Sequence, residues 1–122
     1  MKLQFLTSIL LTISVFSVQA NTQAEIEHLL DYVRSTDCQY ERNGTMHTGA
    51  EAVKHIQRKY KHFADDIVTA EDFVRLSATK SMMSGKYYQV HCEGQPTVKS
   101  QDWFLIELKN YRLEQTDSPK LN

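Results

Sequence analysis

The chain contains two cysteines, Cys38 and Cys92, and each belongs to a short segment with the pattern of a β-strand. In residues 38–42 and 87–92, apolar and polar side chains alternate, which is the period of a strand with one buried face. In an exported chain, an even number of cysteines favours disulfide formation, and two cysteines allow a single pairing. A Cys38–Cys92 disulfide would make the two segments neighbours. The sequence therefore predicts a two-stranded sheet with a covalent link between distant parts of the chain.

The first 20 residues have the pattern of a secretory signal peptide. Lys2 supplies a positive charge, an apolar run extends from Leu3 to Val18, and Ala20 precedes the expected cleavage point. The run is short and interrupted by Ser and Thr, which disfavours a stable membrane span. We expect cleavage before Asn21, no membrane anchor after cleavage, and a periplasmic location.

Residues 21–122 are enough for one small domain and too few for two. We expect a single globular domain, with a frayed tail from about residue 115, and a monomeric protein. The net charge of −1 at pH 7 provides no basic footprint for nucleic acid and no polybasic cluster for anionic lipid.

Four segments carry the signals of helices. Three of them begin with Thr followed three residues later by an acid, which is the pattern of a capping box: Thr22 and Glu25, Thr48 and Glu51, Thr69 and Asp72. The fourth begins at Ser100 and has apolar residues around most of its circumference, which predicts a central position. The predicted fold class is α+β, a small and mostly helical domain in the order α-β-α-α-β-α. Its two-stranded sheet must pack on the helices, because so small a sheet is unstable alone.

Polar residues gather in two turns and along one face of a helix. Arg42 ends the first strand at an Asn-Gly turn, and a Ser-Gly-Lys turn precedes the second strand. Glu51 and His55 lie one helical turn apart, with His47 just before the helix. If the strands pair, the two turns form one surface. This candidate polar surface comprises Arg42, Asn43, His47, Glu51, His55, Ser84, Gly85 and Lys86.

These residues allow several interpretations. His47, Glu51 and His55 could together bind Zn²⁺, but an ordinary solvated helix face explains them with fewer requirements. We expect Arg42 to pair with Glu51 or Asp72, and a carboxylate or phosphate ligand is the alternative. The sequence contains no legible catalytic set, so we assign no catalytic residue, no metal and no cofactor.

The order of these motifs is similar to that of a known family. The resemblance lies in Arg42-Asn43-Gly44, His47-Thr48, Glu51-Ala52, His55, Lys59, Thr69-Ala70-Glu71, Phe73, Ala78, Ser84-Gly85-Lys86, Tyr88 and Val90. On these residues the chain resembles the YfeK-like family of small exported bacterial proteins, a domain of unknown function. Tyr87 departs from the pattern, since proline is expected there. The resemblance implies a bacterial periplasmic setting and no particular activity.

The sequence favours a non-enzymatic binding or structural module of the cell envelope, whose partner is an envelope protein or a glycan. One alternative is an inhibitor or immunity-type partner of a secreted enzyme. Another is a small metal-dependent envelope enzyme that uses His47, Glu51 and His55. A deep polar cleft would favour the enzyme, and a convex surface would favour the binding proteins.

Overall fold

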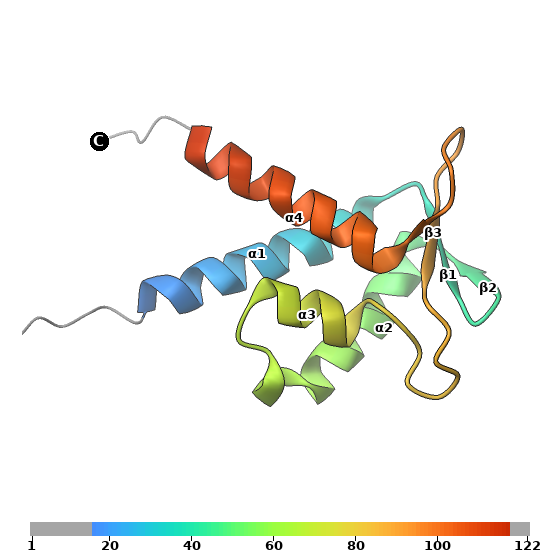
Figure 1. The fold of residues 1–122 in the computed structure, drawn as a ribbon, viewed down its shortest axis with the longest axis horizontal. Coiled ribbons are helices and arrows are strands. Elements are labelled where there is room, and N and C mark those ends of the chain that lie inside the picture. Colours follow the sequence, from blue (N-terminus) through green and yellow to red (C-terminus); the bar gives the residue numbers. More distant parts are fainter. Residues whose placement is uncertain (1–15, 118–122) are drawn as a thin grey trace, which may run out of the picture.

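The computed structural model describes residues 16–117, with side chains from residue 21 onward. Its helices are α1 (Phe16–Ser35), α2 (Gly49–His62), α3 (Ala70–Ser77) and α4 (Ser100–Asp117), with a short 3-10 helix, η1 (Ala64–Asp66), after α2. Its strands are β1 (Gln39–Arg42), β2 (Thr45–His47), β3 (Gln89–His91) and β4 (Val98–Lys99). Figure 1 shows the helices packed together, with the strands gathered at one end of them.

The expected signal peptide lies mostly outside the described residues. Residues 1–15 are not described, whereas residues 16–20 form the beginning of α1. No helix within residues 16–117 has the length and apolar character needed to cross a membrane. The segment expected to fray continues α4 as far as Asp117, and residues 118–122 again lie outside the described part.

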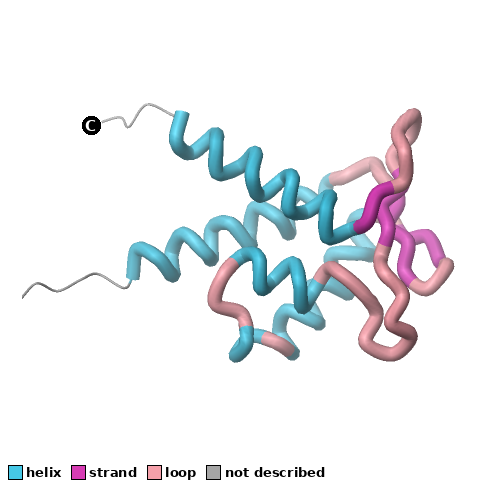
Figure 2. Tube along the Cα trace, viewed as in Figure 1, coloured by secondary structure: helices cyan, strands magenta, loops and turns pink. Residues whose placement is uncertain are grey.

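The α+β fold class is confirmed, but the sheet has four strands rather than two. All neighbouring strands are antiparallel, in the order β2-β1-β3-β4. Figure 2 shows the strands in magenta, gathered beside the helices. The two predicted strands form the central pair, β1 and β3, with Tyr40 opposite Val90. The missed strands β2 and β4 have only three and two residues, and most of them are exposed. Strands this short, without a buried face, give no alternation to detect.

The predicted disulfide is present between Cys38 and Cys92. Cys38 directly precedes β1 and Cys92 directly follows β3, so the bond joins the two central strands at one end. The other end of β1 runs into a turn in which Asn43 and Gly44 both have positive φ, 51° and 80°. This conformation favours the Asn-Gly pair, because Gly has no Cβ and Asn tolerates the left-handed region.

Two of the three predicted capping boxes are confirmed. Thr48 and Glu51 cap α2, and Thr69 and Asp72 cap α3, each with both reciprocal hydrogen bonds. The third prediction is wrong for this structure, because Thr22 lies inside α1, which begins at Phe16. A hydroxyl cannot cap a helix whose backbone continues on both sides of it.

The core lies between the four helices and one face of the sheet. It is built from apolar side chains of every major helix and from Tyr40, Tyr88 and Val90 of the sheet region. The Tyr40 hydroxyl is hydrogen-bonded to Ser100 Oγ at 2.9 Å, which satisfies both buried groups. α4 is less central than predicted: it contacts α1 and α3, but Ile106 is 61% exposed. Only one of its faces is therefore buried.

Candidate functional site

The two polar turns meet in space. Ser84 Oγ donates to Asn43 Oδ1 at 2.6 Å, and Asn43 Nδ2 is 3.5 Å from Ser81 Oγ. Asn43 follows β1 and Ser84 lies in the loop between α3 and β3, 41 positions later. The two turns therefore lie side by side, whereas the candidate polar surface as a binding surface remains a prediction.

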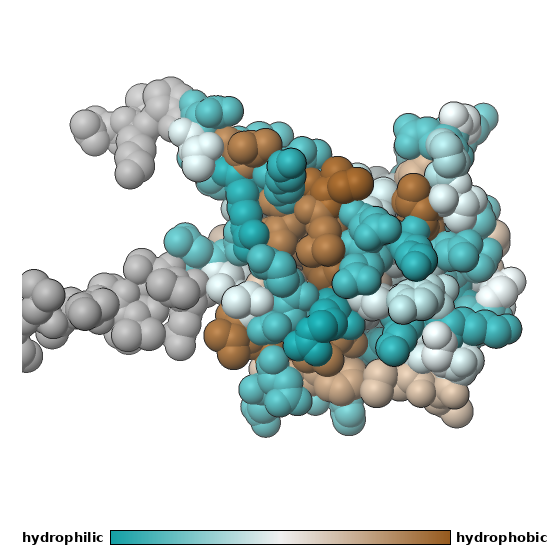
Figure 3. All heavy atoms as spheres, in the orientation of Figure 1, coloured by the Kyte–Doolittle hydropathy of each residue, from teal (hydrophilic) through white to brown (hydrophobic). Residues whose placement is uncertain are grey.

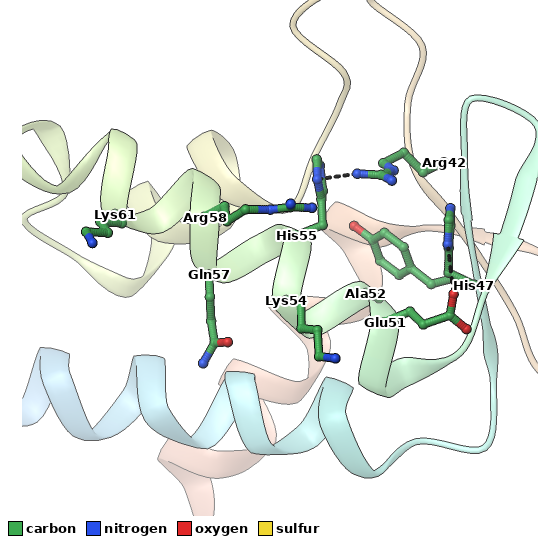
Figure 4. A pocket seen from close by; sticks show the side chains of 10 residues that line it. Arg42, His47, Glu51, Ala52, Lys54, His55, Gln57, Arg58 and Lys61 are labelled. Carbon is green, nitrogen blue, oxygen red and sulfur yellow. Dashed lines mark hydrogen bonds and ion pairs between the residues drawn. The ribbon is translucent and has the colours of Figure 1, made fainter.

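A chain of polar contacts starts at Arg42 beside these turns. The guanidinium contacts Nδ1 of His55 on α2, and Figure 4 shows this contact as a dashed line. Nε2 of His55 is 3.1 Å from the hydroxyl of Tyr88. Lys59, one helical turn after His55, donates to the same hydroxyl at 3.3 Å and to the carbonyl of Lys80 at 2.7 Å. Two side chains of α2 thus contact one phenol, and Arg42 joins this cluster through His55.

The chemistry of these groups fixes the direction of each hydrogen bond. A guanidinium can only donate, so His55 Nδ1 accepts and His55 Nε2 carries the proton. Nε2 then donates to the Tyr88 oxygen, which also accepts from Lys59. With both acceptor positions occupied, the Tyr88 hydroxyl retains its own proton as a donor. The free capacity of the cluster consists of donors: the remaining N–H groups of Arg42, one N–H of Lys59 and the Tyr88 O–H.

Burial and positive charge keep His55 neutral. Burial, together with the nearby charges of Arg42, Lys59 and Arg58, lowers the pKa of His55 to about 4. Burial and the charge of Arg42 also lower the pKa of Lys59. Like charges are therefore held together here, with a neutral imidazole between them.

A hollow of about 770 Å³ opens beside this cluster, between α2, the turn after β1 and the loop at residues 81–88. We call it the basic groove. Its cations are Arg42, Arg58 and Lys59, and no Asp or Glu of the described residues lines it. A smaller hollow of about 530 Å³ adjoins it and shares Arg42, His47, His55 and Arg58. Figure 4 shows this second hollow, where Glu51 is the one acidic side chain among those that line it.

The predicted salt bridge of Arg42 with Glu51 or Asp72 is wrong. Among the described residues, Arg42 forms no ion pair with a carboxylate. Glu51 is taken by the cap of α2, where it accepts from Thr48. Asp72 caps α3 and pairs with Arg75 at 3.2 Å. Each acid is thus occupied by partners close to it in the sequence, so neither pairs with Arg42.

The zinc site considered as an alternative, with His47, Glu51 and His55 as ligands, is not assembled in the described residues. His47 Nδ1 is 3.5 Å from Glu51, but His55 is turned toward Arg42 and Tyr88. Within the part of the chain that the structure describes, no group of three or more His, Cys, Asp or Glu side chains is placed to hold a metal ion. The capping bonds of Glu51 with Thr48 lower the pKa of this carboxyl, with a smaller contribution from His47. The i, i+4 pairing of Glu51 with His55 is thus replaced by a pairing with His47.

Comparison with known proteins identifies the family of this chain. The profile of a family described as "Family of unknown function (DUF5329)" matches residues 20–112. The chain belongs to the DUF5329 family. The uncharacterized protein YfeK of Salmonella typhimurium is 34% identical over 83 residues, which cover 66% of this chain and 69% of YfeK. The YfeK-like resemblance is therefore confirmed. No solved structure matches the chain.

In this DUF5329 chain the remaining predicted residues play smaller parts. Gly85 has a φ of 71°, so it serves the turn. Lys86 is exposed, and its backbone closes the loop through the hydrogen bond from Ser81 N to Lys86 O at 3.0 Å. Neither residue lines the basic groove.

Several residues of the groove are not among the site residues predicted from the sequence. Lys59 could have been found, because it lies four positions after His55 and so on the same helix face. Tyr88, Met82 and Met83 belong to a distant segment, and only folding brings them to α2. Nothing in their local sequence indicates that position.

Proposed function

We propose that this chain is an exported, non-enzymatic module of the cell envelope that binds an anionic group of its partner in the basic groove. The observation that carries the proposal is the convergence of Arg42, Arg58 and Lys59 on one hollow without a carboxylate among its described lining residues.

The unused hydrogen-bonding capacity of the groove supports an anionic ligand. Arg42, Lys59 and the Tyr88 hydroxyl all have donors to spare, and the burial and crowding that lower the pKa of Lys59 disfavour its charge. An oxyanion would accept from these donors and offset the repulsion between Arg42 and Lys59. Charge-assisted hydrogen bonds of this kind are the stronger ones in proteins. Carboxylates and phosphates of an envelope protein or glycan have the required oxygens.

Two features support an envelope location. The N-terminal 20 residues have the charge and hydropathy pattern of a signal peptide. The Cys38–Cys92 disulfide is of the kind that persists in oxidising compartments such as the bacterial periplasm. Fractionation of cells that express the full chain tests this part. We expect periplasmic protein with Asn21 at its N-terminus, and intact cytoplasmic protein beginning at Met1 would contradict it.

The anion site is tested by NMR titration of the purified protein with inorganic phosphate. We expect the Arg42 side-chain signals and the amides of His55 and Tyr88 to shift together. Arg42→Gln should abolish these shifts. Arg75→Gln is the matched control, because Arg75 is an exposed arginine of α3 outside the groove. Shifts that persist in Arg42→Gln, or that also disappear in Arg75→Gln, would place any anion binding elsewhere.

The non-enzymatic part of the proposal has its own measurement. A phosphate ester incubated with the protein should be recovered intact, because His55, the imidazole of the cluster, is already engaged by Arg42 and Tyr88. Hydrolysis that is lost in Arg42→Gln would overturn this part and leave the anion site in place.

A further inference from the structure

Beyond its cations, the basic groove has an apolar rim. Met82 and Met83 are 69% and 99% exposed, and both line the groove together with the half-buried Phe63. Methionine side chains are unbranched and adapt to irregular apolar shapes, so they suit a surface that accommodates a chain. The groove therefore combines positive charge and exposed apolar surface in one hollow.

The two methionines are held out by an ordered loop. Gly85 N donates to Ser81 O at 2.9 Å, and Ser81 N donates to Lys86 O at 3.0 Å. Ser84 ties the same loop to Asn43 on the opposite turn. These bonds span Met82 and Met83 on both sides. Their exposure is thus a property of the hydrogen-bonded loop, and the apolar rim keeps a fixed position relative to Arg42.

A simple anion would leave this rim in water. The cations can bind an anionic headgroup, but the exposed Met82 and Met83 and the half-buried Phe63 gain nothing from inorganic phosphate or from a hydrophilic acid. A ligand with an apolar chain behind its anionic head covers both parts. The volume of about 770 Å³ lies in the usual range for small-molecule sites.

We propose that the basic groove binds an anionic single-chain amphiphile, with the head on Arg42, Lys59 and Tyr88 and the chain along Phe63, Met82 and Met83. This inference rests on the proposed function, since it names the class of anion that the same site takes. The complementarity is twofold: oxyanion acceptors meet a donor-only cluster, and methylene groups meet the exposed methionines.

A second exposed apolar surface provides the control. Figure 3 shows apolar side chains along α4, where Ile106 is 61% exposed and does not line the groove. Substitution of Ile106 removes a similar apolar group from a different surface.

The test is isothermal titration calorimetry with alkyl phosphates below their micelle concentrations. The ligands are inorganic phosphate, hexyl phosphate and decyl phosphate, with decyltrimethylammonium as the probe of opposite charge. We expect decyl phosphate to bind at least tenfold more tightly than hexyl phosphate, because each buried methylene adds to affinity. Decyltrimethylammonium should bind at least tenfold more weakly than decyl phosphate.

Variants show which residues bind the head of the ligand and which bind its alkyl chain. The double variant Met82→Ser/Met83→Ser should lose most of the dependence on chain length and keep the binding of inorganic phosphate. Arg42→Gln should weaken every phosphate ligand, and Ile106→Ser should bind as the wild type does. The methionines are exposed, so their replacement leaves the core intact, which circular dichroism verifies.

The outcomes separate the two proposals. Equal affinities for inorganic, hexyl and decyl phosphate, all lost in Arg42→Gln, would overturn the amphiphile and retain the anion site. Binding of decyltrimethylammonium as tight as that of decyl phosphate would overturn the role of the cations. No binding of any phosphate ligand would overturn both proposals.

Discussion

Two arginines at opposite ends of the molecule have different surroundings. Arg112 on α4 donates to Glu25 on α1 at 2.6 Å and to Glu71 on α3 at 2.7 Å. These two partners raise the pKa of Arg112 and so stabilise its charged form. Arg42 contacts a neutral histidine instead, near Lys59 and Arg58.

The difference separates a structural cluster from a candidate binding site. Around Arg112, one cation and two carboxylates connect three helices, so removal of the cation lowers the free energy of unfolding. At the groove, cations are kept together without an acid, which opposes folding. An arrangement of this kind is typical of functional sites, where perturbed groups cluster.

The largest expected effect comes from the covalent link at the sheet end. Removal of the disulfide by Cys38→Ser/Cys92→Ser should lower the free energy of unfolding by about 4 kcal/mol, by the loop-entropy argument for a separation of 54 residues. Urea unfolding of the oxidised protein and the variant measures the change. Hydrogen exchange should show β1 and β3 losing more protection than α1. Equal loss throughout would show that the two ends unfold as one unit.

The next largest loss of stability is expected at the contact between α1 and α2. A Cβ on Gly49 would lie 2.1 Å from the carbonyl oxygen of Val33, at the close approach of α2 to α1. Gly49→Ala should therefore lower the free energy of unfolding by about 2 kcal/mol through overpacking. Ala50→Ser, at the exposed neighbouring position, should stay within about 0.5 kcal/mol of the wild type. A neutral Gly49→Ala would mean that the two helices separate without cost.

The direct comparison uses the two arginines themselves. Arg112→Gln should lower the free energy of unfolding by about 1 kcal/mol, since the Arg112 side chain is 44% exposed and solvent screens its ion pairs. Arg42→Gln should leave stability within about 0.5 kcal/mol or raise it, because it removes a repulsion with Lys59. Thermal and urea unfolding of both variants provide the measurement. A greater loss of unfolding free energy in Arg42→Gln than in Arg112→Gln would mean that Arg42, and not Arg112, has the structural role.

A pH dependence of stability belongs to the groove. The pKa of His55 is about 4 in the folded state, below its usual value of about 6.5. Between these pH values the unfolded chain binds a proton that the folded chain does not bind. The contribution of His55 to stability therefore falls as pH is lowered from about 6.5 to 4.

His55→Gln isolates this contribution. Glutamine can accept from Arg42 and donate to Tyr88, but it does not titrate. Urea unfolding of both proteins at several pH values in this window should show a steeper loss in the wild type. Identical slopes would mean that His55 is protonated in the folded protein, in conflict with its contact with Arg42.

The sequence by itself determined the local features of this protein. The boxes at Thr48 and Thr69 follow from bonds between residues three positions apart, which any chain with that spacing can form. The strands β1 and β3 follow from alternation, and the Cys38–Cys92 bond follows from the count of cysteines. Thr22 shows the limit of such rules, since a capping signal is overruled when the helix continues beyond it.

Only the tertiary structure decided the basic groove. His55 was predicted to face Glu51 along the helix. Instead, Arg42 and Tyr88, which belong to other segments, each contact one of its two ring nitrogens. Met82 and Met83 carry no local pattern. Their loop lies beside α2, where Lys59 donates to the carbonyl of Lys80, and Ser84 ties it to Asn43. The physical reason is range: capping and alternation act within a few residues, whereas the groove is assembled by contacts between residues that are distant in the chain.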